Sequence, residues 1–187
     1  MDGWAEHVFA LVCGQDAFHT WAPGGALLPF CQRCSGFYSG AAVALALQAL
    51  LWMRPGARFL QVHGLFLLLM IPFGFHWLPQ GALARTLLGL LYGFGVVSFL
   101  WLWPGVRLGA TRPASRGRLV LYAAGVAACL VAVPALSVWG GRAARQTLVA
   151  LALVGLAGIG ALALANLGIG FAWITSRLAH RRPRVAS

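Results

Sequence analysis

The chain has 187 residues, of which 60% are hydrophobic and 9% are charged, and its mean hydropathy is +0.81. A soluble domain needs about a quarter of its residues charged to cover its surface. This composition therefore excludes an ordinary soluble fold and predicts a polytopic membrane protein. The net charge of +11 comes from 14 arginines. Because these lie in short segments between apolar blocks, we interpret them as helix anchors and expect no nucleic-acid partner.

Residues 1–34 form an N-terminal segment that bears cysteine and histidine. It contains no apolar run of the roughly 20 residues that a membrane span requires. We expect a half-buried helix and a loop at the membrane interface, with Trp4 and Trp21 as anchors. The Pro-Gly-Gly at 23–25 should break this segment. Residues 1–5 carry an acid and no basic cluster, so we expect no cleaved signal peptide.

Five apolar segments follow, and each is long enough to cross a bilayer. The expected spans cover about 35–53, 59–78, 83–103, 119–139 and 147–174. The predicted fold class is therefore all-α, a transmembrane helix bundle of about five spans over residues 35–175. The fifth span is long for one crossing, which predicts that it is tilted or extends past the interface. Residues 176–187 are basic, and we expect them to form a disordered tail.

Small residues and prolines within the spans predict local features. Ser35 is expected to cap the first span. Gly36 and Gly40 form a G-x-x-x-G pair, which would let a neighbouring helix approach closely. Pro72 and Gly74 are expected to kink or interrupt the second span. A re-entrant second segment is the alternative to five full crossings.

Five crossings place the two chain ends on opposite sides of the membrane. In this scheme ten arginines lie on the side of the C-terminus and four on the side of the N-terminus. The positive-inside bias then predicts a cytoplasmic C-terminus and an N-terminus outside. The expected partners are membrane lipid and, through helix–helix contacts, an oligomer or a larger membrane complex.

Residues 29–40 read P-F-C-Q-R-C-S-G-F-Y-S-G. Two residues between Cys31 and Cys34 let both sulfurs point to a common centre, where they either bond to each other or hold one soft metal ion. A thiol at the start of a helix and beside Arg33 is also more readily ionised. The pair therefore indicates a metal site or a redox-active dithiol.

Zinc takes four ligands, so this pair alone does not complete a zinc site. The further candidates are Cys13, His7, His19 and His76. We favour Cys13 because it lies in the same extramembrane segment as the pair. His76 is an ionisable residue inside an apolar span, where it needs a partner or a cavity.

The remaining polar residues have simpler interpretations. Cys129 in mid-helix is expected to be a buried hydrophobe, and His63 is expected to snorkel or to hydrogen-bond a neighbouring helix. Arg85 at a helix start indicates an acidic partner such as Asp16 or Glu6, or else lipid phosphate. No acid follows Asp16 in the sequence, which disfavours a transporter with a carboxylate relay. The common hydrolase, metalloprotease and phosphate-loop motifs do not occur.

The pattern Cys-x-Arg-Cys-Ser-Gly-x-Tyr-x-Gly, which runs from Cys31 to Gly40, resembles the signature of a bacterial and archaeal integral-membrane family, domain of unknown function 2085. Cys13-Gly14-Gln15 resembles the Cys-His-Gln of that family. Arg85, with the glycines at 89 and 93, resembles its Arg-x-x-x-Gly-x-x-x-Gly. The chain departs from the family at Gly14, and again at Gly74-Phe75-His76, where the family has Asp-Gly.

The resemblance implies a protein of a bacterial or archaeal cytoplasmic membrane but implies no particular reaction. It also implies one site formed by Cys13, Cys31, Arg33, Cys34 and Arg85, with Tyr38 in support.

Three functional hypotheses follow, in order of preference. The first is a membrane protein that binds zinc or copper through Cys13, Cys31 and Cys34, aided by a histidine. The second is a thiol–disulfide oxidoreductase in which the C-x-x-C pair reacts with a substrate disulfide and a quinone reoxidises it. The third is a scaffold or accessory subunit with a structural cysteine staple. The sequence leaves open whether the protein is an enzyme.

Overall fold

The structure is a computed structural model that describes residues 3–74, 77–110 and 112–180. Within this part of the chain it is a helix bundle with one pair of two-residue strands, which confirms the predicted all-α class. In chain order the elements are α1 (Gly3–Ala10), the 3₁₀ turns η1 (Ala17–His19) and η2 (Pro23–Gly25), α2 (Gln32–Leu51), β1 (Met53–Arg54), α3 (Ala57–Gly74), α4 (Ala82–Leu100), α5 (Leu102–Arg107), β2 (Arg112–Pro113), α6 (Arg116–Trp139) and α7 (Arg142–His180).

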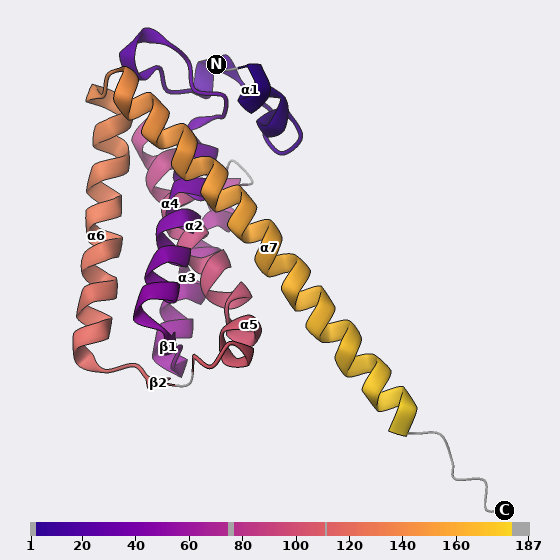
Figure 1. Ribbon diagram of the computed structural model, residues 1–187. Helices are drawn as coiled ribbons and strands as arrows, with labels where there is room; N and C mark the ends of the chain where they lie inside the picture. The colour runs from indigo at the N-terminus through magenta and orange to yellow at the C-terminus, as the bar shows by residue number, and fades with distance from the viewer. Residues whose placement is uncertain (1–2, 75–76, 111, 181–187) are drawn as a thin grey trace, which may run out of the picture.

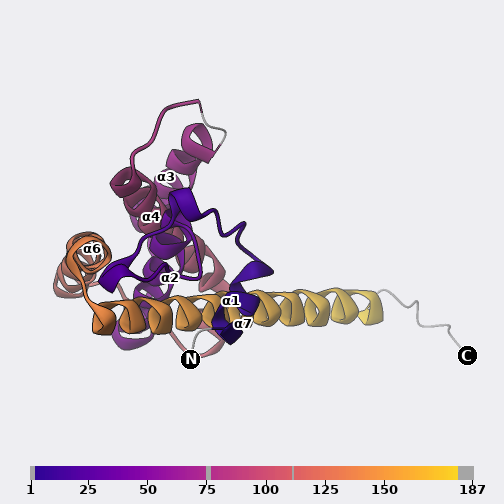
Figure 2. The same cartoon turned by 90° about the horizontal axis from the view of Figure 1, so that it is seen from above.

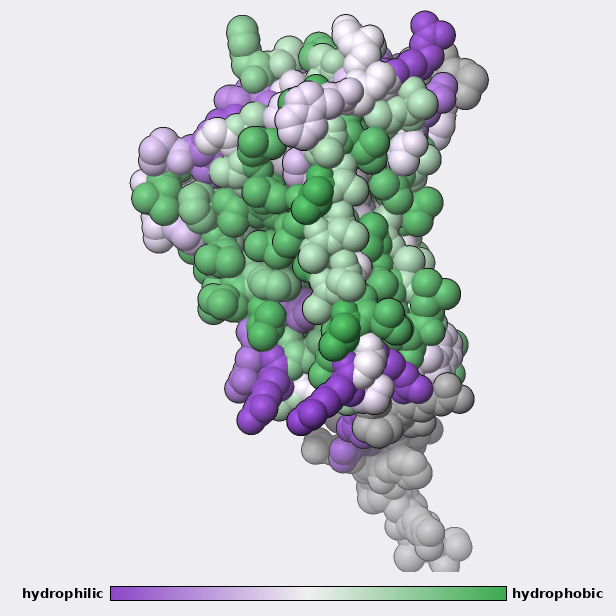
Figure 3. Space-filling view, turned by 90° about the vertical axis from the view of Figure 1, so that its left-hand side faces the viewer, coloured by the Kyte–Doolittle hydropathy of each residue, from purple (hydrophilic) through white to green (hydrophobic). Residues whose placement is uncertain are grey.

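Five of the helices are long and apolar enough to cross a membrane, as predicted: α2, α3, α4, α6 and α7. The shortest of them, α3, has 18 residues. At 1.5 Å per residue it is about 27 Å long, close to the thickness of the hydrocarbon core. Figure 3 shows the corresponding surface, a broad hydrophobic belt with hydrophilic side chains gathered toward its two ends.

Helices α2 and α4 run parallel, with their backbones in direct contact. A β-carbon at Gly36 would overlap the carbonyl oxygen of Thr86, and one at Gly40 would lie 2.5 Å from the carbonyl oxygen of Leu90. Gly89 of α4 faces the backbone of α2 in the same way. The predicted close approach is confirmed. It places the N-termini of these two helices side by side at the end of the bundle that carries α1 (Figure 1).

Helix α2 begins earlier than expected. Cys31 is its N-cap and Gln32 its first residue, so the expectation that Ser35 caps this span is wrong. The side chain of Ser35 is fully buried, and its N–H donates a hydrogen bond of 2.8 Å to the carbonyl of Cys31. The apolar run starts only after a polar first turn, which is why hydropathy places the start too late. Cys34 therefore lies inside the first turn.

Helix α7 crosses the bundle obliquely and then runs away from the other helices (Figures 1 and 2), as its length predicts. Its N-terminal half packs on α2, where Gly155 faces the backbone of Tyr38. The amide of Asn166 then donates a hydrogen bond of 2.7 Å to the carbonyl of Leu100 at the end of α4.

The helix continues through His180, so the expected disordered tail is wrong for residues 176–180. Residues 181–187 lie outside the described part of the chain.

Two other spans are shorter than expected. Pro72 lies inside α3, which ends at Gly74 rather than at residue 78. Helix α4 ends at Leu100, and the short helix α5 follows at Leu102. Beyond α5, at the end of the bundle opposite α1, Met53 of β1 pairs with Arg112 of β2 in parallel register.

Buried polar side chains link four helices in the half of the bundle nearer to β1. His63 Nε2 lies 2.9 Å from the Tyr122 hydroxyl, which lies 3.5 Å from Ser98 Oγ. Ser98 Oγ also accepts a hydrogen bond of 3.1 Å from the Gln48 amide. The predicted bond from His63 to a neighbouring helix is confirmed. Cys129 is buried in α6, also as expected.

Candidate metal centre

Three of the four cysteines converge on one point. The Sγ atoms of Cys13, Cys31 and Cys34 lie within 4.8 Å of one another, although a long loop separates the first from the other two. All three are free thiols. The structure thus brings together the three cysteines that the sequence grouped, and it places them at the N-terminus of α2.

The end of α1 and a turn after it hold Cys13 in place. The N–H of Cys13 donates a hydrogen bond of 2.8 Å to the carbonyl of Phe9. Gln15 then takes a left-handed backbone conformation with φ of 47°. Its side-chain amide donates to the carbonyls of Glu6 at 2.8 Å and Pro29 at 3.0 Å. Because Pro29 lies two residues before the C-x-x-C pair, this amide ties the Cys13 turn to the entry into α2.

Backbone contacts hold together the two ends of the loop between Cys13 and Cys31. Thr20 and Cys31 form an isolated antiparallel bridge, and the N–H of Leu28 donates a hydrogen bond of 2.8 Å to the carbonyl of Trp21. At the loop's far end Gly24, with φ of 69°, lies against the turn between α6 and α7. The loop therefore contacts the bundle at its two ends and at Gly24, while residues such as Phe18 between these points are exposed.

Trp21 joins this loop to α4. Its indole N–H donates a hydrogen bond of 2.9 Å to the Thr86 hydroxyl, so the half-buried ring tethers the loop to α4. Trp4 is 58% exposed on α1, which leaves its ring available to the membrane interface.

An aromatic cluster fixes α1 over the start of α2. The ring centroid of Phe9 lies 4.6 Å from that of Phe30 and 5.6 Å from that of Tyr38. All three side chains are buried. Tyr38, which the resemblance places in support of the site, therefore acts through packing beneath α1.

Hydrogen bonds concentrate negative charge on Cys13. The Cys31 and Cys34 thiols donate toward its sulfur and lower the pKa of Cys13 well below its usual range. The backbone N–H of Cys31 adds a further bond of 3.3 Å. The bond to Cys13, in turn, raises the pKa of Cys31. Without a metal, the arrangement favours one shared thiolate, because three thiolates at this spacing would repel one another.

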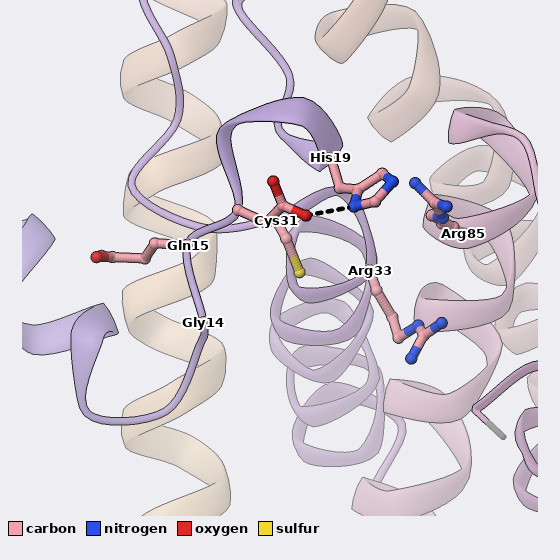
Figure 4. Close-up of a pocket in the computed structure, with 7 residues that line it drawn as sticks. Gly14, Gln15, His19, Cys31, Arg33 and Arg85 are labelled. Carbon is pink, nitrogen blue, oxygen red and sulfur yellow. Dashed lines mark hydrogen bonds and ion pairs between the residues drawn. The ribbon is translucent and has the colours of Figure 1, made fainter. Parts of the chain in front are cut away.

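A cavity of about 390 Å³ opens beside Cys31, with Arg33, Arg85, Asp16, His19 and the turn at Gly14 and Gln15 as its walls. In Figure 4 the ring of His19 points toward Arg85, while Gln15 points away from the other side chains. His19 Nδ1 lies 2.6 Å from a carboxylate oxygen of Asp16. Of the three clustered cysteines, Cys31 is the one that lines this cavity.

The two arginines bind neutral oxygens. Arg85 Nη1 donates to the side-chain carbonyl of Gln32 at 3.4 Å, and Arg33 Nη2 donates to the carbonyl of Phe73 in α3 at 3.2 Å. Within the described residues, the expected ion pair of Arg85 with Asp16 or Glu6 is not formed, so that expectation is wrong. Asp16 reaches the same cavity, but its carboxylate is hydrogen-bonded to His19.

None of the candidate histidines lies in the sulfur cluster among the residues that the structure describes. His7 is exposed, and its ring bonds to the carbonyl of Gly3 within α1. His19 lines the neighbouring cavity and pairs with Asp16. His76 lies outside the described residues.

Sequence patterns alone do not reveal two residues of this site, Gln32 and Thr86. Gln32 lies between Cys31 and Cys34 and is 6% exposed. The one sequence signal for its role was the presence of an amide side chain in the polar first turn of a membrane span. The hydroxyl of Thr86 lies 3.2 Å from the backbone carbonyl of Gln32. Thr86 follows Arg85 in the sequence, but no sequence pattern around it indicates a contact with α2.

Comparison with protein families shows that residues 13–99 match the family described as "Predicted membrane protein (DUF2085)". The match covers the sulfur cluster, both arginines and α2 to α4, and it confirms the resemblance drawn from the sequence. Comparisons with curated proteins and with solved structures gave no match to this chain.

Proposed function

We propose that this membrane protein binds one zinc or copper ion through Cys13, Cys31 and Cys34. The observation that carries the proposal is the convergence of three sulfurs from two separate segments within 4.8 Å. A zinc–sulfur bond is about 2.3 Å long, so thiolates around one tetrahedral ion lie roughly 3.8 Å apart. Small side-chain movements would bring the three sulfurs to that spacing.

The donor set favours a soft ion. Thiolates select zinc and Cu(I) over the hard cations that prefer oxygen. For zinc, three sulfurs leave a fourth position, which is the pattern of sites that exchange a ligand. The cavity beside Cys31 would supply water or a small ligand at that position, and His76 remains a candidate for it.

A bound ion would fasten the N-terminal segment to the bundle. Cys13 follows α1, whereas Cys31 and Cys34 belong to the start of α2, so one ion held by all three would close the intervening loop. We also propose that this end of the protein faces outside. At the opposite end, Arg54, Arg58 and the arginines of the 107–118 segment gather as the positive-inside bias requires of a cytoplasmic face.

Elemental analysis and thiol counting on detergent-purified protein test the proposal. We expect about one zinc or copper per chain in the wild type and a loss of most of it in Cys13→Ser and Cys34→Ser. Cys129→Ser is the matched control, because Cys129 is buried in α6 away from the cluster, and it should keep the metal. Metal-free protein after growth with either ion would contradict the proposal.

A second candidate function is thiol–disulfide exchange, favoured by the position of Cys31 at the wall of the cavity. Cys31 would pass its proton to the Cys13 thiolate, to which its thiol already donates, attack a substrate disulfide and release one substrate thiolate. Cys34 would then attack the mixed disulfide and release the second thiol. The pair would end as a disulfide, with two electrons transferred to the substrate. In the opposite direction, the Cys31–Cys34 disulfide would accept two electrons from a substrate dithiol. A quinone would then take two electrons and two protons from the reduced pair and restore its disulfide.

Thiol counts separate these functions. Bound metal with all three thiols protected supports the metal site. Metal-free protein with a pair that can be oxidised and reduced reversibly supports exchange. A permanent disulfide that survives denaturation supports a structural staple.

A further inference from the structure

We propose that the cavity beside Cys31 is an anion site that binds a phosphate group between Arg33 and Arg85. The inference does not require a metal at the sulfur cluster, so it extends beyond the proposed function. It rests on the cavity, on the charged side chains that line it and on the hydrogen-bond partners of those side chains.

The charges at this cavity are unbalanced. The two guanidinium groups lie at its wall with a single carboxylate, Asp16. That carboxylate accepts hydrogen bonds from the Phe18 N–H at 3.0 Å and is paired with His19. Among the described residues, the hydrogen bonds of the two guanidinium groups go to the neutral oxygens described above. An anion in the cavity would therefore meet two cations that form no ion pair within the described part of the chain.

The backbone adds positive potential at the same place. The N-termini of α2 and α4 lie side by side, and their N-caps, Cys31 and Gly81, form no side-chain cap hydrogen bond. The first turn of a helix carries unsatisfied N–H groups and a partial positive charge. The glycine contacts between the helices hold Arg33 and Arg85 near each other, so both effects act on the same cavity.

A phosphate group fits these features. Arginine presents a planar fork of donors that matches the geometry of phosphate oxygens. A cavity of about 390 Å³ holds such a group together with water. Two sources supply this chemistry: the headgroup of a phospholipid in the surrounding leaflet and a soluble phosphate from outside. The site lies where the spans α2 and α4 begin, which is the depth of the headgroups.

Calorimetric titration in a phosphate-free maltoside detergent tests the site with two probes, inorganic phosphate and short-chain soluble phosphatidylglycerol. We expect one binding site per chain for at least one probe. Arg33→Gln and Arg85→Gln should each weaken binding about tenfold or more, because each removes a charge-assisted hydrogen bond. Arg142→Gln is the matched control, since Arg142 is an exposed arginine at the same end and not part of the cavity wall.

The outcomes are distinct. Binding of inorganic phosphate identifies a soluble anion, whereas binding of the lipid alone identifies a headgroup site. Absence of binding by both probes, or equal losses in all three variants, would overturn the inference. Arg85→Lys keeps the charge and guards against a folding defect: it should bind more tightly than Arg85→Gln. Metal content measured on the same samples should stay unchanged in Arg85→Gln, so failure of the anion site is distinguishable from failure of the metal site.

Discussion

Gly36 of α2 lies directly against the carbonyl of Thr86 in α4, with no room for a β-carbon between the two backbones. This contact sets how closely the N-termini of the two helices approach, and with them Arg33, Cys34 and Arg85. Gly36→Ala should therefore force the helices apart and destabilise the protein by about 1–3 kcal/mol. The thermal unfolding midpoint in detergent measures this effect, and it should fall clearly below that of the wild type.

Gly160→Ala provides the control for that substitution. Gly160 lies in the interior of α7, and a β-carbon there would meet nothing within 4 Å. Alanine should be tolerated at this position. An equal drop in midpoint for both variants would show that the contact between Gly36 and Thr86 is not what matters.

The five spans and the all-α class could be predicted from the sequence for two reasons. A membrane span must satisfy its backbone N–H and C=O groups within its own helix, and it must present apolar side chains to lipid. The spacing of Gly36 and Gly40 predicted the close helix contact for a similar local reason. The start of α2 could not be placed in this way. Its first turn contains Gln32 and Arg33, whose polar side chains face the site rather than lipid, and hydropathy does not register them as helical.

The Tyr122 hydroxyl is predicted to stabilise the bundle. It bonds to His63 and approaches Ser98, both of them buried. Tyr122→Phe leaves two buried polar groups without this partner and should cost about 1–3 kcal/mol. Tyr92→Phe is a suitable control because the Tyr92 ring packs against Phe37, 5.4 Å between centroids, a contact that phenylalanine preserves. Unfolding in detergent should separate the two variants.

The lowered pKa of Cys13 predicts a thiolate in metal-free protein near neutral pH. Its pKa is lower in the folded protein than the usual 8.5 or so of an unfolded chain. Its contribution to stability is therefore fully present above that unfolded value and is lost as the pH falls through the folded value. Thiolate absorbance in the ultraviolet should report about one thiolate per chain near neutral pH. Cys13→Ser should remove it, while Cys129→Ser should not. A signal that develops only near pH 8.5 would contradict this arrangement.

Removal of the metal is predicted to loosen the N-terminal segment selectively. An ion present at about 100 times its dissociation constant stabilises the state that binds it by about 2.7 kcal/mol. Chelation should therefore increase amide hydrogen exchange in the loop between Cys13 and Cys31 by about tenfold or more. The amides of the N-terminal half of α6, at the opposite end of the bundle from the cluster (Figure 1), serve as the internal reference. An equal increase of amide exchange in α6 and in the loop would contradict a local stabilising effect of the metal.

The site was only partly predictable. The spacing of Cys31 and Cys34 is a local pattern, and Cys13 could be grouped with them because it shares their extramembrane segment. The partners of Arg85 and Trp21, by contrast, come from residues 53 and 65 positions away. Such contacts depend on how α2 and α4 pack, which no local pattern specifies. Arg85 donates to the Gln32 amide oxygen, while the Asp16 carboxylate is hydrogen-bonded to His19 and to the Phe18 N–H.

X-ray absorption spectroscopy at the metal edge is the most direct test of the proposed centre. For zinc-loaded protein the account predicts about three sulfur ligands at roughly 2.3 Å and one lighter ligand. Cys13→Ser should lower the sulfur count or abolish binding. A first shell made only of nitrogen and oxygen, or three sulfurs that persist in Cys13→Ser, would contradict a metal centre built from Cys13, Cys31 and Cys34.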